Sequence, residues 1–198
     1  GVTRVLALRG DMPRGMAGPV PRSYEHASEL VAALRRMHDF DIAVAAYPEK
    51  HPEAASLDAD IDHLKEKLDA GARRAICQFV LNPEAYGRFL DACARHGIEA
   101  PIVPGLMPLE QWPRVRRFAV ANGARVPGWL DGLFDGIGET PELMRPVATA
   151  ATLEQLRRLV AYGAPAVHVY TLNRWEMPLA LARMLGRDRP PELPVPLE

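Results

Sequence analysis

Several side chains suited to ligand binding and proton chemistry follow directly after short apolar segments of this 198-residue chain. Arginine, glycine and aspartate follow residues 5–8, tyrosine follows 42–46, glutamine follows 75–77, and an arginine comes shortly after 166–170. These residues are Arg9, Gly10, Asp11, Tyr47, Gln78 and Arg174. Parallel α/β folds carry their chemistry at the carboxyl ends of the strands. We therefore expect one ligand ringed by these strand ends.

The apolar segments, together with a shorter one at 101–104, are typical of strands buried on both faces in a parallel sheet. Helical periodicity separates them, and between 127 and 163 it is interrupted at 136–141. Strand and helix therefore alternate, which predicts right-handed βαβ units. Five such units are fewer than the eight of a closed barrel, which typically takes ~250 residues, and could also form an open doubly wound sheet. The pattern alone does not decide between these two architectures.

Two capping signals predict where helices begin. Asn82 is a suitable N-cap and is followed by Pro83, which is favoured at the first helical position. Ser23 is the predicted N-cap of the first helix. The buried face of that helix is predicted to hold four apolar residues at helical spacing: Ala27, Leu30, Leu34 and Met37.

The overall composition favours a cytoplasmic protein that binds small molecules. The net charge of -1 gives no reason to expect nucleic acid or an anionic membrane as partner. No apolar run approaches the ~20 residues that span a bilayer. Cys77 and Cys93 are interpreted as buried, reduced thiols. Neither the cysteines nor the histidines have metal-ligand spacing, so we expect no metal site.

Six separated blocks of residues carry a family resemblance. They are residues 6–11 (Leu-Ala-Leu-Arg-Gly-Asp), 45–54 (Ala-Ala-Tyr-Pro-Glu-Lys-His-Pro-Glu-Ala), 65–72 (Lys-Glu-Lys-Leu-Asp-Ala-Gly-Ala), 78–79 (Gln-Phe), 104–105 (Pro-Gly) and 170–174 (Tyr-Thr-Leu-Asn-Arg). In order and spacing they resemble bacterial methylenetetrahydrofolate reductase, an FAD-dependent family, over residues 3 to 186. Any one block alone would be weak, but six together are specific.

The resemblance implies an eight-stranded (β/α) TIM barrel that holds FAD at the strand ends. In such an enzyme NADH or NADPH reduces the flavin, which reduces 5,10-methylenetetrahydrofolate to 5-methyltetrahydrofolate in one-carbon metabolism and methionine biosynthesis. Residues 1–186 would be the carboxyl-terminal part of the catalytic barrel, and 187–198 a proline-rich tail. On this interpretation three strands and the glutamate general acid precede Gly1, and the full-length protein is a homo-oligomer.

The resemblance also assigns residue roles. Asp11 would be catalytic, beside both flavin and pterin. The remaining cofactor-binding residues would be Leu8, Arg9, Gly10, Ala27, Tyr47, His51, Ala54, Asp60 and Lys67. With Asp11, the substrate-binding residues would be Gln78, Phe118 and Arg174. Two positions depart from the family's pattern: Glu66 replaces an arginine on the dinucleotide side, and Arg114 replaces a glutamine.

Several of these residues also have structural interpretations. Tyr47 could cover the core, His51 could be a surface histidine, and Phe118 could be a core aromatic. Arg174 lies at a predicted helix start, where the helix dipole disfavours a cation, so a functional role explains it better than a structural one. The Arg-Gly-Asp triplet matches a cell-adhesion motif, but that role needs an exposed loop, and this triplet continues a strand.

Two other functions remain open. The chain could be a non-catalytic fragment or interaction subunit derived from such a barrel, because the general acid is absent from it. An aldolase-type lyase would need a lysine at a strand end, and none of the predicted strand ends carries one. No motif distinguishes NADH from NADPH as the donor.

Overall fold

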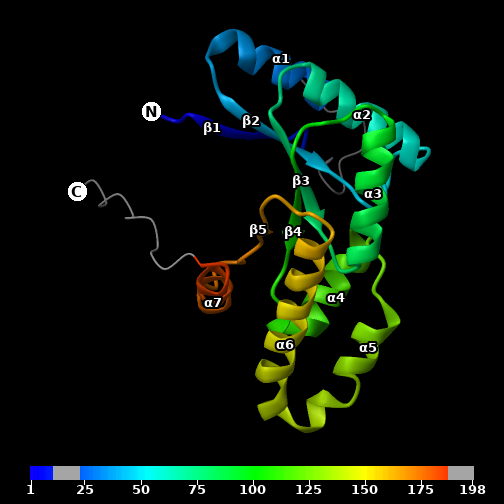
Figure 1. The fold of residues 1–198 in the computed structure, drawn as a ribbon, viewed down its shortest axis with the longest axis vertical. Coiled ribbons are helices and arrows are strands. Elements are labelled where there is room, and N and C mark those ends of the chain that lie inside the picture. The colour runs from blue at the N-terminus through cyan, green and yellow to red at the C-terminus, as the bar shows by residue number, and fades with distance from the viewer. Residues whose placement is uncertain (11–22, 187–198) are drawn as a thin grey trace.

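The computed structural model describes residues 1–10 and 23–186 of the chain. Its centre is a sheet of five parallel strands in the consecutive order β1-β2-β3-β4-β5 (Figure 1). Their bounds are β1 Arg4–Ala7, β2 Asp41–Ala46, β3 Arg74–Phe79, β4 Ile102–Leu106 and β5 His168–Val169. A doubly wound sheet reverses its strand order at a switch point, whereas a barrel does not. The consecutive order therefore favours a partial (β/α) barrel, and the number of eight units stays a prediction.

Seven α-helices lie between and after the described strands. They are α1 Ala27–Met37, α2 Leu57–Asp69, α3 Pro83–Arg95, α4 Trp112–Ala121, α5 Gly128–Phe134, α6 Pro141–Ala161 and α7 Glu176–Met184, with short 3₁₀ turns η1 Leu109–Gln111 and η2 Ile137–Glu139. The predicted interruption at 136–141 is confirmed by the gap between α5 and α6. Helices α1, α2 and α3 follow one another along one side of the sheet (Figure 1).

The start of α1 differs from its prediction. The N-cap is His26 and not Ser23, because the Glu29 carboxylate accepts the backbone N–H of Glu25 at 2.8 Å and closes the first turn there. The predicted buried face was also wrong at its end: Met37 is 77% exposed. Val31 is the fully buried residue of this helix. In contrast, Asn82 caps α3 as predicted, accepting the backbone N–H of Glu84 at 3.1 Å.

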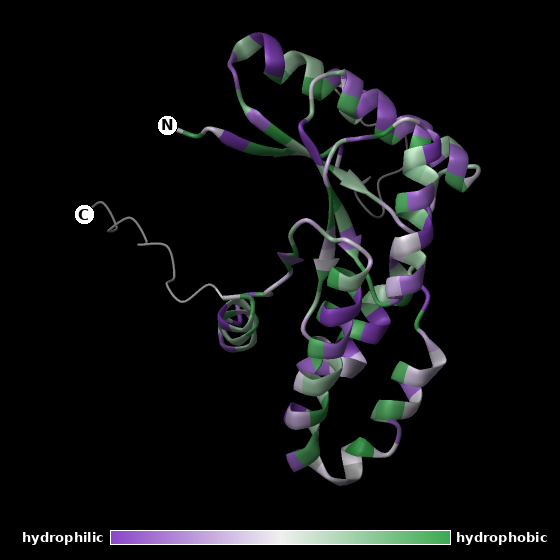
Figure 2. Cartoon of the chain, viewed as in Figure 1, coloured by the Kyte–Doolittle hydropathy of each residue, from purple (hydrophilic) through white to green (hydrophobic). Residues whose placement is uncertain are grey.

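Two apolar clusters form the core. The larger one lies between the sheet and helices α1, α2, α3 and α6, and includes Val44, Tyr86 and Leu159. The second joins the segments after β3 and β4 to α4, α5 and α6, with Trp112 stacked on Phe134 at 4.8 Å between ring centroids. Figure 2 shows hydrophobic and hydrophilic residues alternating along the helices, as expected for helices with one face on the core. The second cluster supports the loops at the carboxyl ends of β3 and β4.

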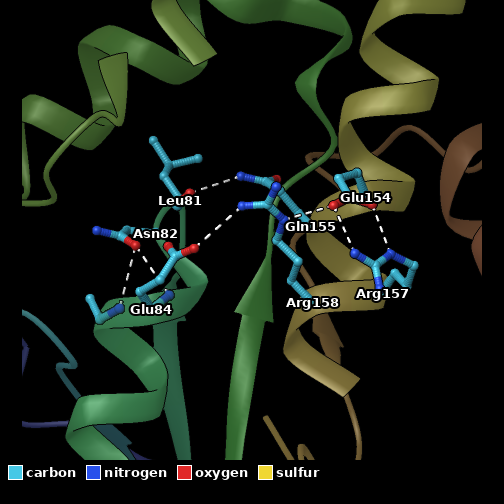
Figure 3. A network of polar contacts seen from close by, with 8 residues as sticks. Leu81, Asn82, Glu84, Glu154, Gln155, Arg157 and Arg158 are labelled. Atoms are coloured by element: carbon cyan, nitrogen blue, oxygen red, sulfur yellow. Dashed lines mark hydrogen bonds and ion pairs between the residues drawn. The ribbon is translucent and has the colours of Figure 1, made fainter. Parts of the chain in front are cut away.

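Two buried polar side chains of α6 fix those same loops. Gln155 donates from Nε2 to the Leu81 carbonyl at 3.1 Å, and Thr152 accepts the Leu109 N–H at 3.2 Å (Figure 3 shows the first). Both side chains are fully buried. On the more exposed side of α6, Arg158 pairs with Glu154 at 2.7 Å and also reaches α3. Helix α6 thus holds the strand-end loops from outside the sheet.

Two general findings concern the described residues. None of their helices combines the length and the hydropathy needed to cross a membrane. Within the same residues, no three His, Cys, Asp or Glu side chains are grouped so that they could hold a metal ion.

Candidate functional site

A recess opens at the carboxyl ends of β2 and β3. Three segments line it: residues 47–50 after β2, residues 78–80 at the end of β3, and residues 122–124 after α4. We call it the central recess. Tyr47 and Gln78, two of the predicted site residues, both line it. The Gln78 carbonyl oxygen Oε1 accepts the N–H of Phe79 at 3.2 Å, which fixes one end of the amide and leaves its NH₂ group as a donor.

Aromatic rings extend from this recess toward β5. Phe79 stacks on Phe118 with ring centroids 5.4 Å apart and meets Tyr170 edge-on at 6.3 Å. Phe118 remains 46% exposed, so one of its sides is open to contact. The Tyr170 hydroxyl donates to the Cys77 carbonyl at 3.1 Å, and burial raises its pKa to about 12, so that it stays a neutral donor. We call Phe79, Phe118 and Tyr170 the aromatic wall.

A second group of predicted residues meets around His51. Its ring contacts Tyr47 edge-on at 4.6 Å, and its backbone N–H donates to Asp60 Oδ2 at 2.8 Å. The ring Nδ1 accepts the N–H of Glu53 at 3.1 Å, which leaves Nε2 as the donor of a neutral ring. Arg9 joins the group through an ion pair with Glu53 at 2.6 Å. The structure therefore brings together residues from the ends of β1 and β2 and from the start of α2, the His51 cluster.

Lys67 reaches the same region from α2. Its ammonium donates to the Ala45 carbonyl at 2.7 Å. Burial lowers its pKa, opposed by the charges of Asp60 and Glu66. An ammonium carries three donors, and Ala45 is the only acceptor that Lys67 has among the described residues. A half-buried cation with unused donors is suited to an anionic ligand.

Glu49 faces the central recess from the loop after β2. Its Oε2 accepts the backbone N–H of Arg125 at 3.0 Å. Burial raises the pKa of this carboxyl group, and the positive charges of Arg125 and Arg88 partly offset the effect. The prediction from sequence did not include Glu49, although it lies two residues after Tyr47 in one of the quoted blocks.

Arg174 is not part of the central recess. It lines a separate polar pocket with Glu110 of η1, Arg145 of α6 and Glu176 of α7. Two residues with positive φ precede it, Leu172 at +49° and Asn173 at +62°, and turn the chain away after β5. In the described residues Arg174 therefore lines a different pocket from Tyr47 and Gln78, although all of these segments follow the carboxyl ends of strands, and its role as a substrate contact stays a prediction.

The structure also describes four of the remaining predicted residues: Leu8, Gly10, Ala27 and Ala54. Leu8 is 53% exposed, and Ala27 is the first residue of α1. The Ala54 N–H donates to the His51 carbonyl at 3.0 Å. Gly10 has φ +78°, and a Cβ placed on it would meet none of the described residues within 4 Å. Asp11 lies outside the described residues.

Two residues of the aromatic wall, Phe79 and Tyr170, were quoted as parts of blocks but were not predicted as site residues. Their burial is set by partners distant in sequence, namely Phe118 and the Cys77 carbonyl. No local pattern reveals such partners. The signal available in the sequence was Phe79, an aromatic residue at a strand end directly after Gln78, the predicted ligand-binding amide.

Residues 1–186 match the family model described as "Methylenetetrahydrofolate reductase". A 5,10-methylenetetrahydrofolate reductase of Pectobacterium carotovorum is 43% identical over 186 residues, which are 94% of this chain and 61% of that relative. The Escherichia coli enzyme of the same name is 42% identical, with 94% and 62% covered. Among solved structures, an uncharacterized Clostridium thermocellum protein that binds 5-methyl-5,6,7,8-tetrahydrofolic acid superimposes with a TM-score of 0.52 at 20% identity. The superposition covers 78% of this chain and 57% of that protein, and it supports the fold alone.

Proposed function

Because the chain belongs to the methylenetetrahydrofolate reductase family, we propose that it forms part of an enzyme that reduces 5,10-methylenetetrahydrofolate to 5-methyltetrahydrofolate. The chain spans 61% to 62% of the length of the two curated relatives compared above. The single observation that carries the proposal for this chain's own residues is the convergence of Tyr47 and Gln78 on one recess beside the aromatic wall. Both residues come from blocks that carry the family resemblance.

We propose FAD as the cofactor, and the chemistry of the His51 cluster fits it. Among the described residues, Lys67 has ammonium donors left over after its bond to Ala45, and His51 in its neutral form has a ring N–H without an acceptor. Arg9 adds a guanidinium group at the end of β1, beside Gly10. These are cationic and neutral donors suited to a pyrophosphate and the sugars of a dinucleotide. When bound, FAD would accept a hydride from NADH or NADPH and deliver it to the folate.

The central recess and the aromatic wall would hold the folate. The Gln78 amide can donate to and accept from the pterin ring, whose edge carries both kinds of group. Phe118 offers its exposed side for stacking, held flat by Phe79 on the other side. We propose Arg174 as a substrate contact, as the family resemblance implies; its guanidinium suits a carboxylate, and the other arginine of its pocket, Arg145, pairs with Glu110 at 3.7 Å.

The proposed reaction balances with one reduced nicotinamide and one proton. The methylene carbon of the folate gains a hydride, its bond to N10 breaks, and N10 takes up a proton. The two electrons come from reduced nicotinamide. Gln78 would orient the pterin for this step, and the aromatic wall would exclude water from one side. Asp11 stays a prediction as the carboxylate beside flavin and pterin, as do the choice of NADH or NADPH, the cytoplasmic location and the homo-oligomeric state.

Absorbance spectroscopy on the full-length protein tests this function. We expect a yellow protein whose flavin band bleaches on addition of NADH or NADPH and returns on addition of 5,10-methylenetetrahydrofolate. A colourless protein, or a flavin that folate does not reoxidise, would contradict the proposal.

A non-catalytic role for the 198-residue chain alone is the second candidate. Among the described residues β1 pairs only with β2 and β5 only with β4, so both outer edges of the sheet lack a strand partner. Turnover assays on the purified chain test this role. Measurable reductase activity would exclude it, whereas folate binding without turnover would support it.

A further inference from the structure

We propose that Glu49 is a positioning residue that fastens helix α4, and with it Phe118, against the central recess. The Glu49 carboxylate follows β2, and its hydrogen-bond partner, the Arg125 N–H, lies four residues beyond the end of α4. The two residues are 76 positions apart in sequence. This single bond therefore joins the lining segment 47–50 to Arg125, the residue directly after the lining segment 122–124.

A packing contact supports the same junction. A Cβ placed on Gly123 would lie 3.6 Å from Pro52 Cγ, so the loop after β2 and the turn after α4 are in van der Waals reach. Gly123 has φ +77°, a conformation that glycine adopts without strain. The two loops thus meet at two points, Glu49 with Arg125 and Pro52 with Gly123.

The turn after α4 transmits this restraint to Phe118. Asn122 donates from Nδ2 to the Phe118 carbonyl at 2.7 Å, and the Ala124 N–H donates to the Ala119 carbonyl at 3.0 Å. The last turn of the helix and residues 122–125 therefore form one hydrogen-bonded unit. Holding Arg125 fixes the end of this unit, and Phe118 lies one helical turn inside it.

The surroundings of the Glu49 carboxylate indicate that its bond to Arg125 serves to position α4 more than to stabilise the fold. The positive groups that act on its carboxylate are Arg125 and Arg88. Lys50 also lines the recess, but its ammonium is engaged by the carbonyls of His51 and Ala54. A half-buried carboxylate with one backbone donor gives up hydration that this bond does not fully replace. An uncharged acceptor at position 49 would keep the hydrogen bond to the Arg125 N–H at a lower cost in folding free energy.

NMR and amide hydrogen exchange on the 198-residue chain test the proposal without depending on activity. In Glu49→Ala we expect the Arg125 amide to exchange about tenfold faster or more, because a hydrogen bond to a charged group is lost. The ring-current shift that Phe79 imposes on Phe118 should shrink in the same variant. Glu49→Gln should restore both signals, and Glu99→Ala, an exposed glutamate before β4, should change neither. In the wild type the Arg125 amide shift should titrate with Glu49, and this titration should vanish in Glu49→Gln.

Folate affinity tests whether the junction matters for the proposed function. Only this part of the experiment rests on that function. Titration with 5-methyltetrahydrofolate should show weaker binding in Glu49→Ala, by about tenfold, and near wild-type binding in Glu49→Gln. Unchanged Arg125 exchange and Phe118 shift in Glu49→Ala would overturn the proposal whatever the ligand result. Full folate affinity in Glu49→Ala would overturn it as well. A wild-type protein that binds no folate would instead count against the proposed function, and the NMR signals would still decide the role of Glu49.

Discussion

The Tyr170 hydroxyl donates to the Cys77 carbonyl at 3.1 Å, so that the segment after β5 reaches β3 across the intervening strand β4. The crossing point is Gly105 in β4. A Cβ there would lie 2.6 Å from the Tyr170 ring and 2.7 Å from the Cys77 oxygen. The aromatic wall therefore depends on a residue without a side chain at this position.

Gly105→Ala should destabilise the chain by about 2–3 kcal/mol, because the added methyl group collides with backbone as well as with a ring. Equilibrium unfolding in urea measures this loss. Gly128→Ala is the matched control, since a Cβ at Gly128 meets nothing within 4 Å and alanine favours the helix that begins there. Equal stability of the two variants would contradict the close approach at β4.

Lys67→Met should have opposite effects on stability and on flavin binding. The lowered pKa of Lys67 means that the folded chain holds this proton less tightly than the unfolded chain. Its contribution to stability therefore rises with pH, from the lowered pKa up to the ordinary value of 10.5, and at neutral pH the buried charge is a cost. Replacing it should therefore raise the free energy of unfolding at pH 7.

The same substitution should weaken FAD binding by roughly tenfold or more, because a charged donor to the dinucleotide is lost. Lys65→Met, on an exposed turn of the same helix, is the control, since Lys65 pairs with Asp69 and not with the sheet. Flavin fluorescence titration and urea unfolding at pH 7 provide the two readouts. A variant that binds FAD with wild-type affinity would remove Lys67 from the cofactor site.

The sequence predicted the five strands, the start of α3 at Asn82 and the interruption between α5 and α6, because each rests on local periodicity and capping. It did not decide between a barrel and a doubly wound sheet, since strand order depends on contacts between units. Arg174 shows the same limit at the level of a site. After β5 the chain passes through two residues in the left-handed conformation, Leu172 and Asn173. They change the direction of the chain, and no periodicity in the sequence predicts that change. Glu49 and Tyr170 were missed because their partners lie far away in sequence.

Phe118→Ala should lower folate affinity by about tenfold with little loss of stability, because the ring stacks on Phe79 yet is 46% exposed. Val120→Ala is the matched control on the same helix, with 58% of the residue exposed. Titration with 5-methyltetrahydrofolate and a urea unfolding curve should be recorded for both. Equal affinity for 5-methyltetrahydrofolate in the two variants would show that Phe118 has a purely structural role.

Thr152→Val should destabilise the chain more than Thr152→Ser, although valine has nearly the size of threonine. The Thr152 hydroxyl accepts the Leu109 N–H at 3.2 Å and donates to the Ala148 carbonyl at 2.7 Å, in a fully buried position. Valine leaves the Leu109 N–H without its acceptor, which costs about 1–3 kcal/mol. Serine keeps the hydroxyl and loses one methyl group, about 0.8 kcal/mol.

Urea unfolding of the two variants ranks these losses, and amide exchange at Leu109 locates them. We expect fast exchange at Leu109 in Thr152→Val and near wild-type protection in Thr152→Ser. Because Leu109 opens the turn η1 after β4, its release should loosen the loop that also carries Glu110 into the Arg174 pocket. Greater destabilisation by serine than by valine would show that the methyl group, and not the hydrogen bond, is the main contribution of Thr152 at this loop.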